Sequence, residues 1–228
     1  MDKTAFGVWP KQLFYGRRKA RPIRAARQDA MDTVLPKCKI VDPKTALQFP
    51  FTPDETWLEI GFGNGDSLAA WHREYPKVGF VGCEPFVNGV SNLCKLVAED
   101  DLSNLRIWHE IAQPLIDALP DASLERIYLL NSDPWPKKRH AKRRFIQQEM
   151  LSKLARILKP GGQLIMTTDH APLADWMWEQ ANEHPGFKTT AKSLDDCRTP
   201  PEGWLITRYE GKGAKAGRRQ VYLPFTKA

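Results

Sequence analysis

The sequence predicts an α/β fold, with a mostly parallel sheet covered by helices on both faces, and three observations support this prediction. From about residue 54, short stretches rich in β-forming residues alternate with helical stretches, which is the pattern of β-α-β units. A glycine-rich turn directly follows the first short stretch. A Pro-Gly-Gly sequence at 160–162 ends one helical stretch and introduces the next strand.

The elements follow in a regular order along the chain. Strands are expected at 56–60, 78–83, 105–109, 126–130 and 163–168. Because parallel strands need long crossover connections, helices are expected between and after them, near 65–75, 86–99, 113–119, 141–158 and 172–183. Beyond residue 184 prolines and glycines interrupt the pattern. We expect a flexible basic loop at 211–217 and then an edge strand at 220–225.

Composition places the chain among soluble globular proteins. It has 228 residues, of which 42% are hydrophobic and 27% charged, which excludes a disordered chain, a collagen and a membrane bundle. The N-terminal sequence MDKTAFGVWP has no apolar signal region, and no apolar run approaches the length of a membrane span. We therefore expect a cytoplasmic protein without membrane attachment.

Cysteines and histidines show no metal-binding pattern. The four cysteines lack a CxxC pair, and the five histidines form no HExxH sequence. We expect four reduced thiols, as in a cytosolic protein, and no catalytic metal.

Positive charge is concentrated at the N-terminus. Residues 1–40 hold ten basic and three acidic residues, and the charges of the other 188 residues sum to zero. We expect a basic, partly flexible arm at 1–40 and a globular domain at 41–228. Since no apolar face accompanies the charge, the arm indicates RNA or DNA rather than an anionic membrane as partner, and the alternative is a solvated tail. Both a monomer and a homodimer stay open.

A glycine-rich turn follows the first expected strand. Gly61, Gly63 and Gly65 allow the backbone to turn sharply and to approach a ligand closely. Glu84 ends the second strand, where a carboxylate can accept hydrogen bonds from both hydroxyls of a ribose. The turn therefore indicates a nucleoside cofactor, with a purely structural turn as the alternative.

Two cofactor classes use such a turn. Dinucleotide-binding turns have a glycine where Asp66 stands, and an acid at that position repels a pyrophosphate. S-adenosylmethionine carries a sulfonium and an ammonium but no phosphate, so Glu59 beside the turn is compatible with it. The sequence therefore favours a methyltransferase over a dehydrogenase.

A rigid basic loop follows the fourth expected strand, at the sheet edge where ligands bind in open α/β folds. It begins with the sequence DPWP, whose prolines stiffen the segment and hold Asp133 in an extended conformation. Six of residues 137–144 are Lys or Arg, and they lead into the helix expected at 141–158. Cations at a helix N-terminus are unfavourable by about 0.3–1 kcal/mol each. We expect phosphates to bind them, with a solvated helix start as the alternative.

Together these motifs resemble the bacterial tRNA (guanine-N7)-methyltransferase family over about residues 50–212. The similarity lies in GFGNG at 61–65 with Glu59 before it, Glu84, DPWPKKRH at 133–140, Thr168-Asp169, and TRYE at 207–210. It implies a Rossmann-like class I methyltransferase fold with a mostly parallel seven-stranded sheet. It also implies S-adenosylmethionine as the methyl donor and tRNA as the partner, with the guanine at position 46 of the variable loop as the methylated base.

The resemblance further implies roles for individual residues. The methyl donor is expected to contact Glu59, Gly61, Gly63, Gly65, Glu84, Ile111 and Asp133. Asp133 is also expected to be the catalytic residue. The substrate nucleotide is expected at Lys137, Asp169, Thr207, Arg208, Tyr209 and Glu210. The tRNA backbone is expected at Arg139, Lys142, Arg143 and Arg144.

Three positions depart from the family pattern. Ile111 stands where the family has Asp or Asn near the adenine, and Glu110 is the adjacent candidate to replace it. Asn131-Ser132 replaces the usual Phe-Pro before the DPW sequence, and the C-terminal QVYLPF lacks the usual acid. The contact to the adenine is therefore the part of the site that the resemblance leaves least determined.

The chemistry of guanine N7 limits what the carboxylates do. N7 carries a lone pair and no proton, so its methylation needs no general base. The product is a cationic purine, and a fixed carboxylate stabilises this charge in the transition state. Carboxylates also accept from N1–H and the 2-amino group, which selects guanine. We expect Asp133 first in these roles, then Asp169 and Glu210. Trp135 either stacks on the base or anchors the loop, and His140 lies near phosphates.

Two other functions compete with this reading. A non-catalytic RNA-binding protein on the same fold would bind tRNA without the methyl donor, and the departures at Ile111 and Asn131 suggest it. A small-molecule methyltransferase would not need the six cations of 137–144.

Overall fold

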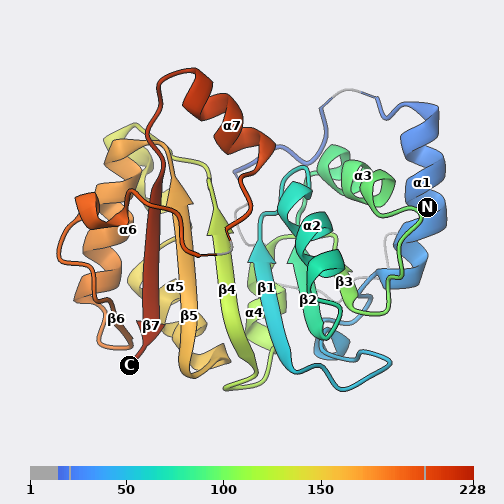
Figure 1. The fold of residues 1–228 in the computed structure, drawn as a ribbon, viewed down its shortest axis with the longest axis horizontal. Helices are drawn as coiled ribbons and strands as arrows, with labels where there is room; N and C mark the ends of the chain where they lie inside the picture. The colour runs from blue at the N-terminus through green and yellow to red at the C-terminus, as the bar shows by residue number, and fades with distance from the viewer. Residues whose placement is uncertain (1–14, 21, 203) are drawn as a thin grey trace.

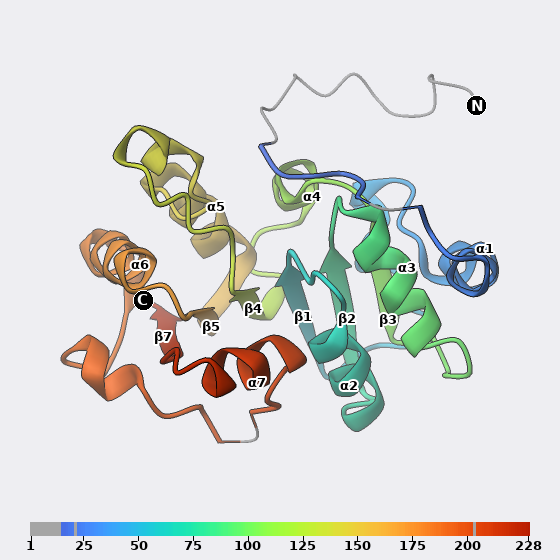
Figure 2. The same cartoon turned by 90° about the horizontal axis from the view of Figure 1, so that it is seen from above.

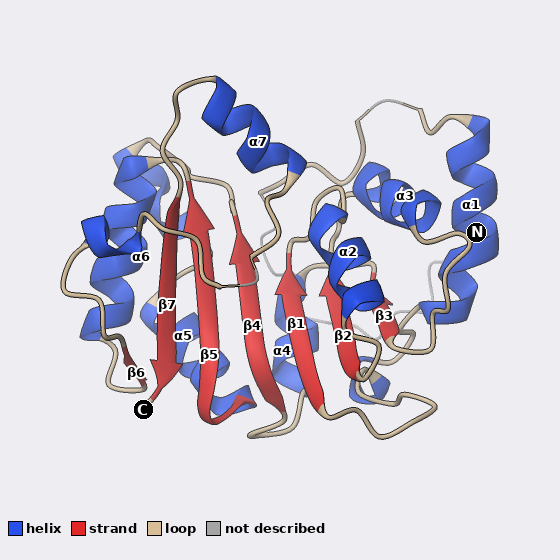
Figure 3. Ribbon diagram, viewed as in Figure 1, coloured by secondary structure: helices blue, strands red, loops and turns tan. Residues whose placement is uncertain are grey.

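The computed structural model describes residues 15–20, 22–202 and 204–228, and its centre is a seven-stranded sheet in the order β3-β2-β1-β4-β5-β7-β6 (Figures 1 and 3). The strands are β1 (Glu55–Ile60), β2 (Val78–Cys83), β3 (Leu105–Trp108), β4 (Leu124–Leu130), β5 (Leu158–Thr168), β6 (Phe187–Lys188) and β7 (Val221–Lys227). Strands β1 to β5 are parallel, and β7 runs antiparallel between β5 and β6. This confirms the predicted, mostly parallel seven-stranded sheet.

Helices cover both faces of the sheet, as Figure 2 shows from above. They are α1 (Ala25–Cys38), α2 (Asp66–Glu74), α3 (Val87–Leu96), α4 (Ala112–Ala118), α5 (Gln148–Ile157), α6 (Ala171–Glu183) and α7 (Arg208–Lys215). The described residues also form three short 3₁₀ turns, η1 (Pro43–Thr45), η2 (Lys138–Arg143) and η3 (Leu194–Cys197). Trp57 packs with α1, α2 and α3, whereas Leu58 packs with α4, α5 and α6. Successive strand residues point to opposite faces, so the sheet has a core on each side.

Strand β7 differs from the expected edge strand at 220–225. It pairs with β5 along its length and with β6 on its other side. Leu223 and Phe225 are buried in the core beside α6. The expectation of an edge strand was wrong because the two-residue strand β6 is too short to be recognised from its sequence.

Helix α7 replaces most of the flexible loop expected at 211–217. Thr207 accepts a hydrogen bond from the backbone N–H of Glu210, and the Glu210 carboxylate accepts one from the backbone N–H of Thr207. This reciprocal capping box starts the helix in spite of two glycines within it. Figure 1 shows α7 above the carboxyl ends of β4 and β5.

Helix α5 begins at Gln148, seven residues later than the helix expected at 141–158. The basic residues form the separate turn η2, and Arg144 after it is extended. Its Nε donates to the backbone carbonyl of Pro134 at 3.2 Å, which folds the basic segment back on the DPWP sequence. The cations therefore do not oppose the dipole of α5, and the expected helix-terminus penalty does not arise.

The second half of the segment 1–40 belongs to the core. Helix α1 buries Val34, Leu35 and Cys38 against α3 and β3. Residues 1–14 and Arg21 lie outside the described part of the chain. Whether 1–40 behaves as an arm stays a prediction, and the structure adds that residues 25–38 are anchored.

The carboxyl ends of β1, β2, β4 and β5 lie at one edge of the sheet (Figure 1). The strand order reverses beside β1, between its neighbours β2 and β4. Ligands of open α/β sheets bind in the crevice at such a reversal. Among the described residues, no helix is long and apolar enough to cross a membrane.

Candidate active site

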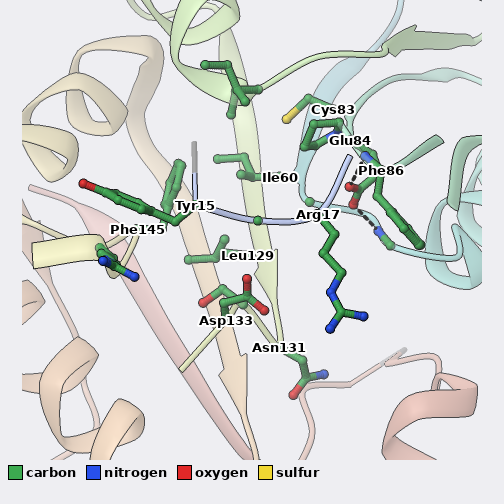
Figure 4. Close-up of a pocket in the computed structure, with 18 of the residues that line it drawn as sticks. Tyr15, Arg17, Ile60, Cys83, Glu84, Phe86, Leu129, Asn131, Asp133 and Phe145 are labelled. Atoms are coloured by element: carbon green, nitrogen blue, oxygen red, sulfur yellow. Dashed lines mark hydrogen bonds between the residues drawn. The ribbon is translucent and has the colours of Figure 1, made fainter. Parts of the chain in front are cut away.

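A cavity of about 630 Å³ opens at this edge of the sheet, between the ends of β1, β2 and β4 (Figure 4). Its volume lies within the range of cofactor sites. Five residues expected to bind the methyl donor line it: Gly61, Gly63, Glu84, Ile111 and Asp133. The glycine turn and the rigid loop after β4 therefore share one cavity.

The glycine turn requires its glycines for two different reasons. Gly63 has a φ of +54°, and nothing lies within 4 Å of an added Cβ, so it is the backbone conformation rather than space that requires glycine here. Gly65 also has a positive φ, but a Cβ there would lie 2.7 Å from Leu93. Gly65 does not line the cavity, and it allows α2 to pack closely on α3.

Glu84 is held in a fixed orientation at the end of β2. Its Oε2 accepts from the backbone N–H of Gly63 and its Oε1 from that of Phe86, each at 2.8 Å, and both bonds are drawn in Figure 4. Burial raises the pKa of Glu84, the two backbone donors lower it, and the charge of Asp133 raises it. Each carboxylate oxygen keeps a further lone pair for a ligand hydroxyl.

Glu59 is a buried acid, with 3% of its surface exposed. Its Oε2 has no hydrogen-bond partner in the described part of the chain. Burial, followed by the charges of Glu84 and Asp66, raises its pKa to about 8. It does not line the cavity directly. A cationic group of a ligand would stabilise its ionised form.

Glu110 does not stand open beside the cavity as a replacement for the missing acid. Its two oxygens pair with the Arg18 guanidinium. The backbone carbonyl of Ile111 accepts from Trp108 Nε1 at 2.8 Å. The wall at this position is formed by Ile111, Ala112 and Phe86, so it offers apolar contact to a ring.

The loop after β4 is held by aromatic and cationic contacts. Asp133 is exposed and lines the cavity. The Trp135 ring lies edge-on against Tyr15 and His140, at 5.9 and 5.8 Å. The Arg143 guanidinium lies 4.3 Å from the Tyr15 ring and 5.0 Å from the Trp135 ring. Trp135 is therefore packed on two sides, which favours its role as an anchor of the loop.

The four residues expected to bind the tRNA backbone fall into two pairs. Arg139 and Lys142 are exposed in η2. Arg143 and Arg144 are half-buried, and Arg144 also lies over the Trp176 ring. Lys137 is exposed at the start of η2. The solvent-facing cations suit phosphates, whereas the half-buried arginines brace the loop.

The N-terminal segment crosses the cavity, which the sequence did not predict. Tyr15 and Arg17 are among the lining residues, and Figure 4 shows their segment passing over the cavity. The backbone carbonyl of Arg18 accepts from Val87 N–H at 3.0 Å. Basic charge was the only sequence signal of this segment, and it does not locate a contact across the fold.

Gly89 in α3 was also missed. A Cβ at Gly89 would lie 2.1 Å from the carbonyl oxygen of Gly63. The absence of a side chain at Gly89 therefore allows the carbonyl of Gly63 to pack against helix α3. No sequence signal distinguishes it from an ordinary helix glycine.

Among the residues expected to bind the substrate nucleotide, none whose side chain the structure describes lines the cavity. Asp169 follows β5, and Tyr209 in α7 donates to it at 3.4 Å. Thr207 and Glu210 form the helix cap, and Trp204 Nε1 donates to the buried Glu210 at 3.1 Å. The side chain of Arg208 lies outside the described part of the structure. Asp169 and Tyr209 are thus the two that come together with surface available to a ligand.

Known proteins resemble this chain along nearly its full length. A family model described as a putative methyltransferase matches residues 53–223. The tRNA (guanine-N(7)-)-methyltransferase of Rhodospirillum rubrum is 41% identical over 222 residues, which are 93% of this chain and 86% of that protein. The protein of the same name from Agrobacterium fabrum is 42% identical over 219 residues, 94% of each chain.

Solved structures share the fold. The 16S rRNA methyltransferase KamB superposes with a TM-score of 0.55 at 17% identity, over 77% of this chain and 88% of its own. TrmN from Thermus thermophilus gives a TM-score of 0.53 at 15% identity, over 89% of this chain and 48% of its own. These likenesses confirm the class I methyltransferase fold. The matching family model and the relatives above 40% identity show more, namely that the protein belongs to the tRNA (guanine-N7)-methyltransferase family.

Proposed function

We propose that the protein transfers the methyl group of S-adenosylmethionine to N7 of the guanine at position 46 in the variable loop of tRNA. The observation that carries this proposal is the shared cavity: the glycine turn and Asp133 line it together. Exposed cations of η2 lie on the same loop as Asp133. A methyl donor and a polyanion would therefore meet at one edge of the sheet.

The residues around the cavity fit S-adenosylmethionine. The Glu59 carboxyl lies behind the lining residues with an oxygen that has no partner among the described residues, and its charge would favour a ligand ammonium in the cavity. Glu84 is oriented by two backbone donors and can accept from ribose hydroxyls. Ile111 and Phe86 offer apolar surface to the adenine. When bound, the donor supplies an electrophilic methyl group.

Asp133 acts on charge rather than on a proton. Guanine N7 has no proton to remove, and the ring becomes cationic as the methyl group is transferred. A carboxylate at the start of a loop that Pro134 and Pro136 stiffen needs little reorganisation to stabilise that charge. Its exposure allows it to reach a base that enters from outside. We assign Asp133 this catalytic role.

The tRNA would bind by charge at η2 and by contacts at the target nucleotide. Arg139, Lys142 and Lys137 face solvent, where phosphates can reach them. We assign Asp169 and Tyr209 to the base itself, because they contact each other beside the carboxyl ends of the strands. The capping residues Thr207 and Glu210 position Tyr209 by starting its helix.

The test is methylation of an unmodified tRNA with labelled donor, followed by nucleoside analysis. We expect 7-methylguanosine at the variable-loop guanine, and none when that guanine is replaced by adenine. Absence of 7-methylguanosine from the wild-type reaction would refute the proposal. Calorimetry with the donor separates an inactive binding protein from an enzyme, since only the enzyme needs to bind the donor.

A further inference from the structure

Asp169 has a carboxylate oxygen that lacks a hydrogen-bond donor. Its side chain is 10% exposed, and Oδ2 receives no hydrogen bond from any residue that the structure describes. Arg218 Nη1 lies 2.7 Å from Oδ2, which makes an ion pair but not an aligned hydrogen bond. The other oxygen, Oδ1, accepts from the Tyr209 hydroxyl at 3.4 Å. This buried carboxylate can therefore accept a better-aligned donor.

The Arg218 guanidinium occupies the space between this carboxylate and an aromatic ring. Its central carbon lies 5.4 Å from the centre of the Tyr209 ring, within the range of a cation–π contact. Its Nη1 also donates to the Tyr209 hydroxyl at 3.3 Å. The Tyr209 side chain is nevertheless 46% exposed. A planar cation thus lies beside a carboxylate and near an accessible ring.

A guanidinium and the edge of guanine present the same chemistry. The N1–H and 2-amino groups of guanine form a planar pair of donors, as the forked N–H groups of arginine do. Both pair with a carboxylate through two parallel hydrogen bonds, and both present a flat surface to an aromatic ring. Flipped-out bases are recognised through this combination of edge contacts and stacking.

We propose that Arg218 is an internal surrogate for the target guanine: its guanidinium occupies the Asp169–Tyr209 site in the free enzyme, and the guanine displaces it. This inference rests on the proposed function and deepens its account of base recognition. When Arg218 is displaced, Asp169 loses the N–H groups of the guanidinium. Adenine has an acceptor at N1 and cannot replace these donors. Displacement therefore restores the lost contacts for guanine only.

The surroundings of Arg218 allow such an exchange. Its side chain is 43% exposed, so solvent can take up the guanidinium when it leaves the more buried Asp169. Gly217 before it has a φ of +72°, and a Cβ at Gly213 would lie 3.3 Å from Asp169 Oδ2. The missing Cβ of Gly213 therefore leaves space beside both partners of the ion pair.

The site is also linked to the donor cavity. Gln220 Nε2 donates to Asn131 Oδ1 at 2.8 Å, and Asn131 lines the cavity. This bond anchors the chain two residues after Arg218, so the exchange involves the arginine side chain rather than the strand. A base held at Asp169 therefore lies next to the end of β4, from which Asp133 follows.

The experiment compares Arg218→Met with Arg219→Met. Both variants lose one positive charge from adjacent exposed positions, but Arg219 has no ion pair to Asp169. We expect Arg218→Met to bind tRNA about two- to fivefold more tightly than Arg219→Met, with a matching fall in KM, because its competitor is removed. Equal or weaker binding by Arg218→Met would overturn the proposal. Unchanged calorimetric donor binding shows that both variants are folded.

Added guanidinium ion provides a second readout. In Arg218→Met, millimolar guanidinium chloride should refill the site and raise the KM for tRNA, relative to tetramethylammonium chloride at equal ionic strength. Activation of this variant by guanidinium would instead show that the enzyme needs the cation, and would contradict the surrogate role. If the wild-type protein forms no 7-methylguanosine, the proposed function fails. If it does and the two variants behave alike, only the surrogate fails.

Discussion

Substitution of Gly89 by alanine tests whether the glycine turn is held at the position that the donor requires. An alanine Cβ would lie 2.1 Å from the carbonyl oxygen of Gly63, where ordinary contacts begin at 3.4 Å. Both atoms belong to the backbone or are fixed to it, so no side-chain rotation relieves the contact. Either α3 or the turn must move by about 1 Å, and displacements of this size near reacting groups cost about 100-fold in rate.

The magnitude for donor binding follows from the cost of overpacking. When the turn moves to relieve the contact, donor binding must restore its position, and the overpacking cost of about 1–3 kcal/mol then becomes an affinity loss of about 5- to 150-fold. Because alanine is about 1 kcal/mol better than glycine inside a helix, global stability falls by less than donor affinity. A movement of the turn would also affect Glu84, because its carboxylate accepts from Gly63 N–H and its Cγ would lie 3.5 Å from the new Cβ.

Calorimetric titration with S-adenosylmethionine measures the effect, with Gly211→Ala as the matched control. Gly211 also lies in a helix, and nothing lies within 4 Å of an added Cβ there. We expect the control to bind the donor like the wild-type protein. Donor affinity of Gly89→Ala within about twofold of the control would refute the reasoning, because it would show that the turn adapts without loss.

Three further predictions concern charge. Asp133→Ala should abolish 7-methylguanosine formation while filter binding shows tRNA affinity within a few-fold, and a parallel loss of both would contradict its catalytic role. Burial raises the pKa of Glu59 from 4.5 to about 8, so the folded state holds this proton more tightly than the unfolded state does. The free energy of unfolding of the donor-free protein should therefore fall as the pH rises from about 4.5 to about 8. In urea unfolding experiments, the free energy of unfolding of Glu59→Gln should fall less over this pH range. An identical pH dependence in the variant and the wild-type protein would contradict the raised pKa of Glu59. Deleting residues 1–25 should flatten the salt dependence of tRNA binding and, since Tyr15 and Arg17 line the cavity, weaken donor binding. An unchanged salt slope in the filter assay would leave the arm without a role in tRNA binding.

Local patterns predicted the sheet and its ligand edge well. The strand at 78–83 coincides with β2, and the glycine turn and Asp133 meet as the order of strands required. Such features depend on residues close in sequence. The helix at 208–215 was also readable, since Thr207 and Glu210 have the spacing of a capping box. Glycines with low helix propensity outweighed that signal.

Contacts between distant residues account for what the sequence did not reveal. The basic turn η2 ends in a bond from Arg144 to Pro134, and the N-terminal segment is placed by Arg18, which pairs with Glu110 92 positions later. Neither partner is indicated by periodicity or composition. The ion pair between Asp169 and Arg218 is of the same kind.

The segment from Tyr15 to Arg18 has a consequence for the order of events in each turnover. Its side chains touch the loop that carries the cations, and its backbone bonds to α3 beside the glycine turn. A cofactor in the cavity would be covered by this segment, which would also lie beside the bound tRNA. We therefore expect the demethylated cofactor to leave after the modified RNA, and product inhibition by this cofactor to be strongest while RNA is bound.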